Sequence, residues 1–298
     1  MRIAVITTSY PESEDDPSGH FVRAEVRELE RAGNSVRVVA PRAGGAFGWP
    51  GVAARVRERP HRALEAARWI ASAGAELRAT GDFDRIVAHW SVPCAFPIVT
   101  HSGGDDAPLE IVSHGGDVRA LVRIVKPLRA ILVRKLARRA EVWRFVSESL
   151  RDDLLRALAG TERAMVLQIA TVRASPIEVD CAAREAGRAK REELRAPFVA
   201  VAVARLVASK RIDAVIEHVA RSERRELLVI VGDGPERARL EALAKARGVD
   251  ARFTGKLGRR DALAWIAAAD VVLHASREEG LSTVVREASA LGVAVKTV

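Results

Sequence analysis

Short apolar runs recur along the chain and alternate with longer segments whose apolar residues are spaced three and four positions apart. The runs have the length of buried strands, and the longer segments have the period of amphipathic helices. In the first half, strands are predicted at 3–7, 36–40, 85–88, 109–112, 142–146 and 165–169. In the second half, strands are predicted at 198–204, 227–231, 251–254, 271–273 and 293–295, with helices near 211–221, 235–247, 259–268 and 283–291. This alternation predicts an α/β fold with doubly wound parallel sheets.

The alternation is interrupted between residues 170 and 196, where Ser175-Pro176 precedes a charged, Ala-rich stretch with few large apolar side chains. We therefore expect a Rossmann-like domain at 1–175, an interdomain connection at 176–196, and a second Rossmann-like domain at 197–298, the two facing each other across a crevice. Ligands of open parallel sheets bind beyond the carboxyl ends of the strands, so the loops after the strands are the candidate sites.

Composition narrows the class of partner. The chain has 298 residues, a net charge of +9 and only 4% aromatic residues, which leaves few rings for stacking on bases and argues against nucleic acid. Cys94 and Cys181 are isolated, which fits a reducing compartment. The first residues run directly into a strand pattern, and no apolar run approaches the about 20 residues that a spanning helix needs. We expect a cytoplasmic protein.

Residues 119–139 contain eight Lys or Arg and no acidic residue, interleaved with apolar side chains, and Pro127 interrupts the helix that they predict. A basic amphipathic helix of this kind can lie on anionic lipid, which would place the protein at the inner face of a membrane. An Arg-rich solvated face over an ordinary core explains the same pattern. Both interpretations stay open.

Loops after four strands of the second half carry glycines, cations and carboxylates. Arg205 and Lys210 follow the first strand, 232–235 the second, 255–257 the third, and Glu279 and Glu287 the fourth. Glycines let a backbone approach a nucleotide, fixed cations can hold a diphosphate, and carboxylates can accept hydrogen bonds from vicinal hydroxyls. The sequence therefore predicts a site for a phosphorylated ligand with sugar hydroxyls.

These motifs, in this order and spacing, resemble those of the family 4 glycosyltransferases, which are retaining enzymes of the GT-B fold. The matching segments are 205–210, 232–235, 253–257, 268–270 and 279–287, with looser matches at 9–11, 88–90, 114–117 and 146–148. The resemblance spans nearly the whole chain. It implies transfer of a hexose from a UDP- or GDP-sugar to a saccharide or lipid-linked acceptor in polysaccharide biosynthesis, without a metal or other cofactor.

The resemblance also implies roles for individual residues of the second half. Arg205 and Lys210 would bind the donor diphosphate and stabilise the negative charge that develops on the leaving nucleotide. Glu287 would bind the ribose hydroxyls, and Glu279 would engage the donor sugar. The other residues expected to bind substrate, mostly through their backbone, are Gly232, Gly234, Lys256, Leu257, Gly280, Leu281 and Ser282.

In the first half, the resemblance implies that His114 orients the reacting sugar. Gly19 would lie in a loop that offers amides to the phosphate and borders the acceptor site. Retention in this fold is commonly explained by front-face attack, in which the departing phosphate oxygen takes the acceptor proton.

The chain departs from the family pattern at three places. Gly280-Leu281-Ser282 replaces the usual Gly-Phe-Gly or Gly-Phe-Pro, and residues 292–296 replace the usual Gly-x-Pro-Val-Val. The family pattern also continues beyond Val298, so we expect a shortened member or an absent segment. One alternative is a truncated, catalytically inactive protein that binds a nucleotide sugar or a partner. A further alternative keeps the fold and changes the reaction, to that of an epimerase or a phosphorylase.

Overall fold

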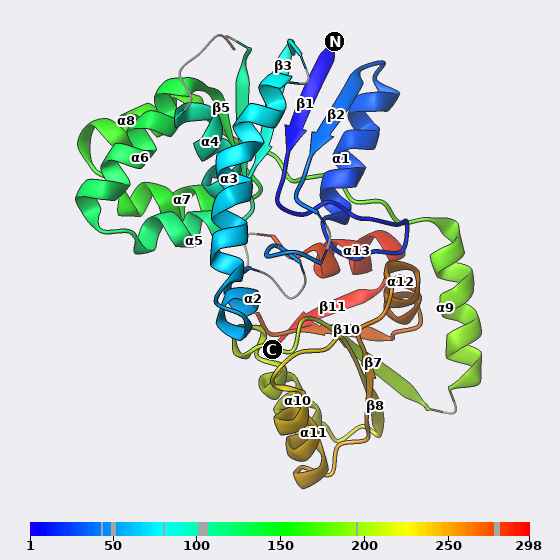
Figure 1. Ribbon diagram of the computed structural model, residues 1–298. Coiled ribbons are helices and arrows are strands. Elements are labelled where there is room, and N and C mark those ends of the chain that lie inside the picture. Colours follow the sequence, from blue (N-terminus) through cyan, green and yellow to red (C-terminus); the bar gives the residue numbers. More distant parts are fainter. Residues whose placement is uncertain (43, 49–51, 80, 101–106, 195, 277–280) are drawn as a thin grey trace. The chain divides into compact units, whose positions relative to one another are not determined.

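The computed structural model describes residues 1–42, 44–48, 52–79, 81–100, 107–194, 196–276 and 281–298 (Figure 1). The chain divides into two compact units. Unit 1 consists of residues 1–12 and 18–176, and unit 2 of residues 13–17 and 177–298. Each unit is built on a parallel sheet.

The sheet of unit 1 has the order β2-β1-β3-β4-β5-β6. Its strands are Arg2–Ile6 (β1), Ser35–Val39 (β2), Arg85–His89 (β3), Leu109–Ser113 (β4), Ala140–Phe145 (β5) and Ala170–Val172 (β6). The helices are His20–Arg31 (α1), Val52–Glu58 (α2), Arg62–Ala79 (α3), Phe96–Thr100 (α4), Gly116–Arg123 (α5), Lys126–Arg139 (α6), Glu148–Ala157 (α7) and Gly160–Ile169 (α8), with a π-helical turn at Ser91–Ala95 (η1). Because β1 lies between β2 and β3, the strand order reverses there, and the loops after β1 and β3 diverge at this switch point.

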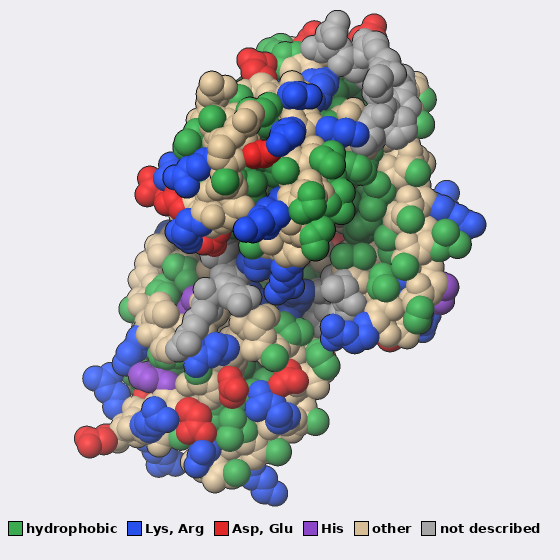
Figure 2. All heavy atoms as spheres, turned by 90° about the vertical axis from the view of Figure 1, so that its left-hand side faces the viewer, with side chains coloured by type: hydrophobic (Ala, Val, Ile, Leu, Met, Phe, Trp, Pro, Cys, Tyr) green, Lys and Arg blue, Asp and Glu red, His purple; other side chains and the backbone are tan. Residues whose placement is uncertain are grey.

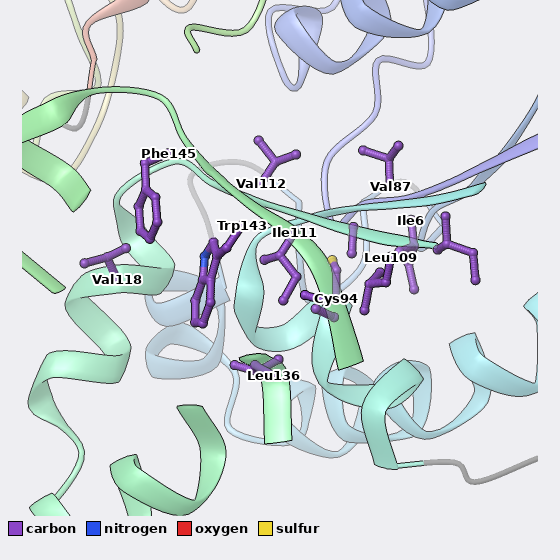
Figure 3. Packing of buried hydrophobic residues seen from close by; sticks show 14 of the residues in the cluster. Ile6, Val87, Cys94, Leu109, Ile111, Val112, Val118, Leu136, Trp143 and Phe145 are labelled. Atoms are coloured by element: carbon purple, nitrogen blue, oxygen red, sulfur yellow. The ribbon is translucent and has the colours of Figure 1, made fainter. Parts of the chain in front are cut away.

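The core of unit 1 lies between the sheet and its helices. Figure 3 shows the Trp143 side chain pointing from β5 toward Leu136 of α6, and both side chains are fully buried. The Trp143 and Phe145 rings lie nearly parallel, at 11°, with centroids 5.8 Å apart. The polar end of Trp143 is satisfied as well, because Nε1 donates a hydrogen bond to Ser113 Oγ at 3.0 Å. This bond ties the core of β5 to the carboxyl end of β4.

The sheet of unit 2 has the order β11-β10-β7-β8-β9. Its strands are Phe198–Val203 (β7), Glu226–Val231 (β8), Ala251–Gly255 (β9), Val271–His274 (β10) and Ala294–Thr297 (β11). The helices are Cys181–Glu193 (α9), Ile212–Ala220 (α10), Arg237–Ala246 (α11), Arg259–Ala267 (α12) and Thr283–Leu291 (α13), with a 3-10 turn at Ala208–Lys210 (η2). The strand order reverses at β7, which pairs with both β8 and β10.

Both faces of this second sheet are covered. Val199 and Val201 of β7 pack in one cluster with Trp265 of α12, whereas Ala200 and Ala202 pack in another with Ile216 of α10 and Leu240 of α11. Successive residues of a strand point to opposite faces, so a strand covered on both sides reads as an unbroken apolar run. This explains why Phe198–Val203 is entirely apolar.

The prediction of two doubly wound α/β halves is confirmed. One predicted strand is wrong, because residues 165–169 end helix α8, and the strand that follows is β6 at Ala170–Val172. The stretch 176–196, expected as a connection, contains α9, which belongs to unit 2. Here α9 packs so closely on α12 that a Cβ on Gly187 would lie 2.5 Å from Cβ of Ala267. Pro127 does interrupt the helix at 119–139, and it stands at the start of α6.

None of the helices in the described part of the chain combines the length and the hydropathy that crossing a lipid bilayer requires.

Candidate active site

The loops that follow β7 and β8 touch through their backbones. Gly232 has φ 138°, and a Cβ at this position would lie 1.9 Å from the carbonyl oxygen of Ala204. A Cβ at Gly234 would lie 2.4 Å from the carbonyl oxygen of Leu206, whose own N–H donates to the Asp233 carbonyl at 2.9 Å. Any side chain at either glycine would separate the loops. The two glycines therefore bring the loop that carries Arg205 against the loop after β8.

The two predicted phosphate-binding cations lie beyond the carboxyl end of β7. Arg205 is exposed, and Lys210 is half-buried at the end of η2, before Arg211 takes up φ 50° and begins α10. Lys210 lies near His274, the last residue of the neighbouring strand β10. Burial and then the charge of Lys210 lower the pKa of His274 below its ordinary value. The structure thus brings Lys210 to the end of β10, where the predicted carboxylate loop begins.

Glu279 and Gly280 lie outside the described residues. The chain after them forms the start of α13, where Ser282 is the N-cap and its Oγ accepts from the Val285 N–H at 3.5 Å. Leu281, just before this cap, is exposed. A helix N-terminus with free amide hydrogens favours an anionic ligand.

Glu287, in α13, is buried and paired with a cation that the sequence motifs do not include. Arg259 Nη1 donates to Glu287 Oε1 at 2.6 Å, and Arg259 Nη2 donates to the Glu178 carbonyl oxygen, also at 2.6 Å. Glu287 is 5% exposed. A buried carboxylate without a cation would be costly, and the ion pair with Arg259 offsets this cost for Glu287. The available signal in the sequence was the pair Arg259-Arg260, which opens the helix after a predicted binding loop.

The loop that precedes α12 carries the residues expected to contact the base. Lys256 is exposed and Leu257 is half-buried, packing against the cluster that contains Trp265. The carbonyl oxygen of Gly255, which has φ 77°, accepts a hydrogen bond from Gly232 N at 2.9 Å. The loops after β8 and β9 are thereby held side by side.

Helix α12 is capped by a residue from the beginning of the chain. Gly258 occupies its N-cap position and has no side chain to offer. Instead, Asp15 Oδ1 accepts from the Arg260 N–H at 2.7 Å, and the Asp15 carbonyl accepts from the Arg259 N–H at 2.8 Å. A Cβ on Gly258 would lie 1.8 Å from Asp15 Oδ2, so a glycine leaves room for this acidic side chain. Asp15 thus satisfies the first amides of the helix that carries Arg259.

In unit 1, the predicted sugar-orienting residue His114 follows β4 and lies in a group of rings. Its ring centroid is 4.8 Å from Phe21, 5.0 Å from Trp90 and 5.1 Å from His89. His89 Nδ1 and His114 Nε2 are 2.9 Å apart. His89 is fully buried, and burial, with the nearby charge of Arg144, lowers its pKa to about 3. Burial and then the neighbouring His89 lower the pKa of His114 well below its ordinary value.

Asp117 organises the backbone on which His114 stands. Its Oδ2 accepts from Ser91 N at 2.9 Å, Ser91 Oγ at 2.9 Å and Ser113 Oγ at 2.7 Å. Its Oδ1 accepts from the N–H groups of His114 and Gly115, both at 3.1 Å. One buried carboxylate therefore joins the loop after β3 to the turn after β4, and it fixes the backbone position of His114.

A buried ionic network lies at the centre of the same sheet. Arg144 of β5 pairs with Glu25 of α1 and, through Nε at 2.5 Å, with Glu110 of β4, which also pairs with Arg85. Burial would raise the pKa of Glu110, but the Arg144 and Arg85 guanidinium groups outweigh it and hold that pKa below its usual range. Burial raises the pKa of Glu25. The positive charge of Arg144 thus adds to the effect of burial in keeping His89 neutral.

Gly19, the remaining predicted substrate-binding residue of unit 1, begins α1. It has φ 66°, and a Cβ on it would lie 2.2 Å from the carbonyl oxygen of Ser9. Only a glycine permits this approach of the loop after β1 to the start of the helix.

Comparisons with known proteins decide the family. The model of the family described as "Glycosyltransferase Family 4" matches residues 18–168, more than half of the chain, and the model described as "Glycosyl transferases group 1" matches residues 183–297. The chain belongs to glycosyltransferase family 4. The resemblance seen in the sequence is therefore confirmed, and the protein is a glycosyltransferase.

Individual relatives agree with this assignment. TuaC of Bacillus subtilis (strain 168), named as a glycosyltransferase of teichuronic acid biosynthesis, is 26% identical, and the match covers 99% of this chain and 80% of TuaC. Sucrose-phosphate synthase from Thermosynechococcus elongatus has a TM-score of 0.74 at 18% identity, covering 99% of this chain and 80% of that one. Anabaena HepE, solved with UDP and glucose, has a TM-score of 0.60 at 18% identity, with the same coverage. These structures support the GT-B fold for this glycosyltransferase.

Proposed function

We propose that this glycosyltransferase transfers a hexose from a UDP- or GDP-sugar to a saccharide or lipid-linked acceptor, with retention of the anomeric configuration. The observation that carries the proposal is the convergence in unit 2 of Lys210, at the carboxyl end of β7, with the end of β10, beside glycine-lined loops after β8 and β9. HepE, which was solved with UDP and glucose, and TuaC, whose name refers to teichuronic acid biosynthesis, support the donor and acceptor classes.

Two positive side chains would supply the electrostatic stabilisation. Arg205 and Lys210 would hold the diphosphate while the bond between its terminal oxygen and the anomeric carbon breaks. Negative charge grows on the departing nucleotide in this step, so fixed cations lower the barrier without a bound metal. The acceptor hydroxyl oxygen would attack the same face of the sugar, and its proton would pass to the departing phosphate oxygen. No side-chain base is then required.

A lipid-linked acceptor is supported by the surface of α5 and α6, because it combines exposed apolar side chains with basic ones. Val125, Leu128 and Ile131 are 67%, 50% and 51% exposed. Exposed Lys126 and Lys135 lie on the same helix, α6. Figure 2 shows apolar side chains gathered between Lys and Arg side chains on the side of unit 1 that carries these helices. Such a surface suits an anionic bilayer, with the basic groups at the headgroups and the apolar groups among the acyl chains.

The direct test is to incubate the protein with a panel of UDP- and GDP-sugars and candidate acceptors, including lipid-linked saccharides, and to measure released nucleotide diphosphate. We expect release from one donor class, accelerated by the acceptor, with EDTA leaving the rate unchanged and the product retaining the donor's anomeric configuration by NMR. Donor binding without any release would refute the proposed transfer, and inversion in the product would refute retention.

A further inference from the structure

We propose that His89 is a positioning residue that fixes the tautomer of His114, so that His114 carries its proton on Nδ1 and acts as a hydrogen-bond donor. This inference rests on the proposed role of His114 next to the donor sugar. It assigns a function to His89, which would otherwise be regarded as a packing residue at the end of β3.

The two imidazoles meet edge to edge. Their planes lie within 14° of parallel and their centroids are 5.1 Å apart, while His89 Nδ1 and His114 Nε2 are 2.9 Å apart. The part of the centroid distance that the nitrogen–nitrogen separation does not cover equals the distances from the two ring centres to these nitrogens. Both nitrogens therefore lie on the line that joins the ring centres. The rings therefore lie almost in one plane, which is the arrangement of an N–H···N hydrogen bond between imidazoles and not that of face-to-face stacking.

This hydrogen bond requires one donor and one acceptor nitrogen. Both rings are held neutral, because burial lowers the pKa of each. A neutral imidazole has one protonated and one bare nitrogen. If His89 Nδ1 carries the proton at this contact, His114 Nε2 is bare and His114 Nδ1 is protonated. If His114 Nε2 carries it instead, His89 Nδ1 is bare and His89 Nε2 is protonated. Two tautomer pairs are available, and they differ in whether His114 Nδ1 donates or accepts.

The surroundings of His89 Nε2 select between these pairs. Its Nε2 is buried and has no hydrogen-bond partner among the residues that the structure describes. A proton on Nε2 would leave a buried N–H donor without an acceptor, which costs more than a bare ring nitrogen at the same place. The favoured tautomer places the proton on Nδ1, so that His89 donates to His114 Nε2.

The remaining groups around His114 hold the ring in place without reversing this choice. Asp117, which faces His114, is occupied by the five hydrogen bonds described above and accepts from the backbone N–H of His114. Phe21 and Trp90 pack against the ring. His114 therefore presents Nδ1–H as a donor suited to a sugar oxygen.

The test uses NMR of the intact protein and two variants of His89. In the wild type, long-range ¹⁵N–¹H correlation should show His114 protonated on Nδ1 and bare on Nε2; the opposite assignment would overturn the proposal without reference to activity. His89→Asn keeps an N–H near the position of Nδ1, whereas His89→Leu removes it. We expect kcat to fall about tenfold in His89→Leu, the value of one neutral hydrogen bond, and to stay within about twofold in His89→Asn, with UDP affinity unchanged in both.

Equal losses of kcat in the Asn and Leu variants would also contradict the proposal. If His89→Leu does not fold, the NMR assignment in the wild type still decides. Failure of the proposed function looks different, because the wild type itself would then release no nucleotide from any donor.

Discussion

Arg259 and Glu287 form a buried ion pair in which Nη1 of Arg259 lies 2.6 Å from Oε1 of Glu287, and their side chains are 11% and 6% exposed. The pair joins the first residue of α12 to the middle of α13. Glu287 is the carboxylate proposed to bind the ribose of the donor. Its position is therefore set by a residue that belongs to none of the family's motifs.

Removing the cation of this pair should destabilise the protein. Arg259→Leu removes the guanidinium group that faces the buried Glu287 carboxylate, and we expect the free energy of unfolding to fall by about 3 kcal/mol, as for other broken buried pairs. The neighbouring exposed Arg260 provides the matched control, because Arg260→Leu should cost less than about 0.5 kcal/mol. Urea denaturation of both variants measures this. Equal stabilities would mean that the buried pair does not support α13.

Lys210 should matter for catalysis and not for folding. Lys210→Ala removes one of the two cations proposed to stabilise the leaving diphosphate, and we expect kcat to fall by about 10²–10³ with an unchanged thermal midpoint. Lys245, exposed in α11, offers the control, and Lys245→Ala should keep the wild-type rate. Nucleotide release under saturating donor measures both rates. Near-normal turnover of Lys210→Ala would end its proposed role.

Asp15 should stabilise α12 from a distance in sequence. Asp15→Ala removes the acceptor for the Arg260 amide, and the loss of an N-cap costs about 1 kcal/mol. Asp15→Asn retains a side-chain oxygen and should recover most of this free energy. Denaturation of the three proteins compares them. A stable Asp15→Ala variant would show that the Asp15 side chain does not stabilise α12.

His89 should make the stability of the protein depend on pH. The unfolded chain binds a proton at this histidine below about pH 6.5, whereas the folded protein resists protonation down to about pH 3. Stability is therefore complete above the unfolded pKa and is lost as the pH falls through this window. We expect His89 to account for about 2 kcal/mol of the loss between pH 7 and pH 5.

The comparison with His89→Asn tests this effect. Glu25 is present in both proteins, and the replacement also removes the part of the pKa lowering at His114 that comes from His89, which changes the pH dependence in the same direction. The variant should lose less stability than the wild type on acidification, when free energies of unfolding are measured at both pH values. Parallel losses would show that His89 is not held neutral in the folded state.

The surface of α5 and α6 should bind anionic membranes. Leu128→Glu combined with Ile131→Glu replaces two half-exposed apolar side chains with charges of the same sign as the lipid, and we expect co-sedimentation with phosphatidylglycerol-containing vesicles to be lost. Leu64→Glu, at an equally exposed leucine of α3, should sediment like the wild type. If the wild type stays in the supernatant, the membrane contact is wrong. If the double variant still sediments, this surface is not the contact.

Most of the fold could be predicted from the sequence because strands covered on both faces are unbroken apolar runs, as at β7. The prediction failed where that signal is ambiguous. Residues 165–169 are apolar enough for a strand, yet Val166 is buried while Leu167 is 50% exposed, and the run ends helix α8. The segment 176–196 lacks large apolar side chains because α9 packs through Gly187, at a distance that only small residues permit.

The candidate site was predicted less completely than the fold. Lys210 and Gly232 could be proposed as site residues because their motifs directly follow a strand, and Glu287 because it ends a motif that begins after a strand. Arg259 and Asp15 could not, since a cation that opens a helix and an acid in a loop resemble ordinary surface residues until the backbone brings them together. Contacts between residues 15 and 260 depend on the tertiary fold and have no local signature.

The central claim is that a nucleotide diphosphate binds at the carboxyl ends of the strands of unit 2, and hydrogen–deuterium exchange with and without UDP or GDP tests it most directly. We expect one of the two nucleotides to slow exchange at 205–210, 232–234, 255–258 and 282–287, with little change over α10 and α11. Unchanged exchange in all four segments at saturating concentrations of both nucleotides, or protection confined to unit 1, would contradict the claim.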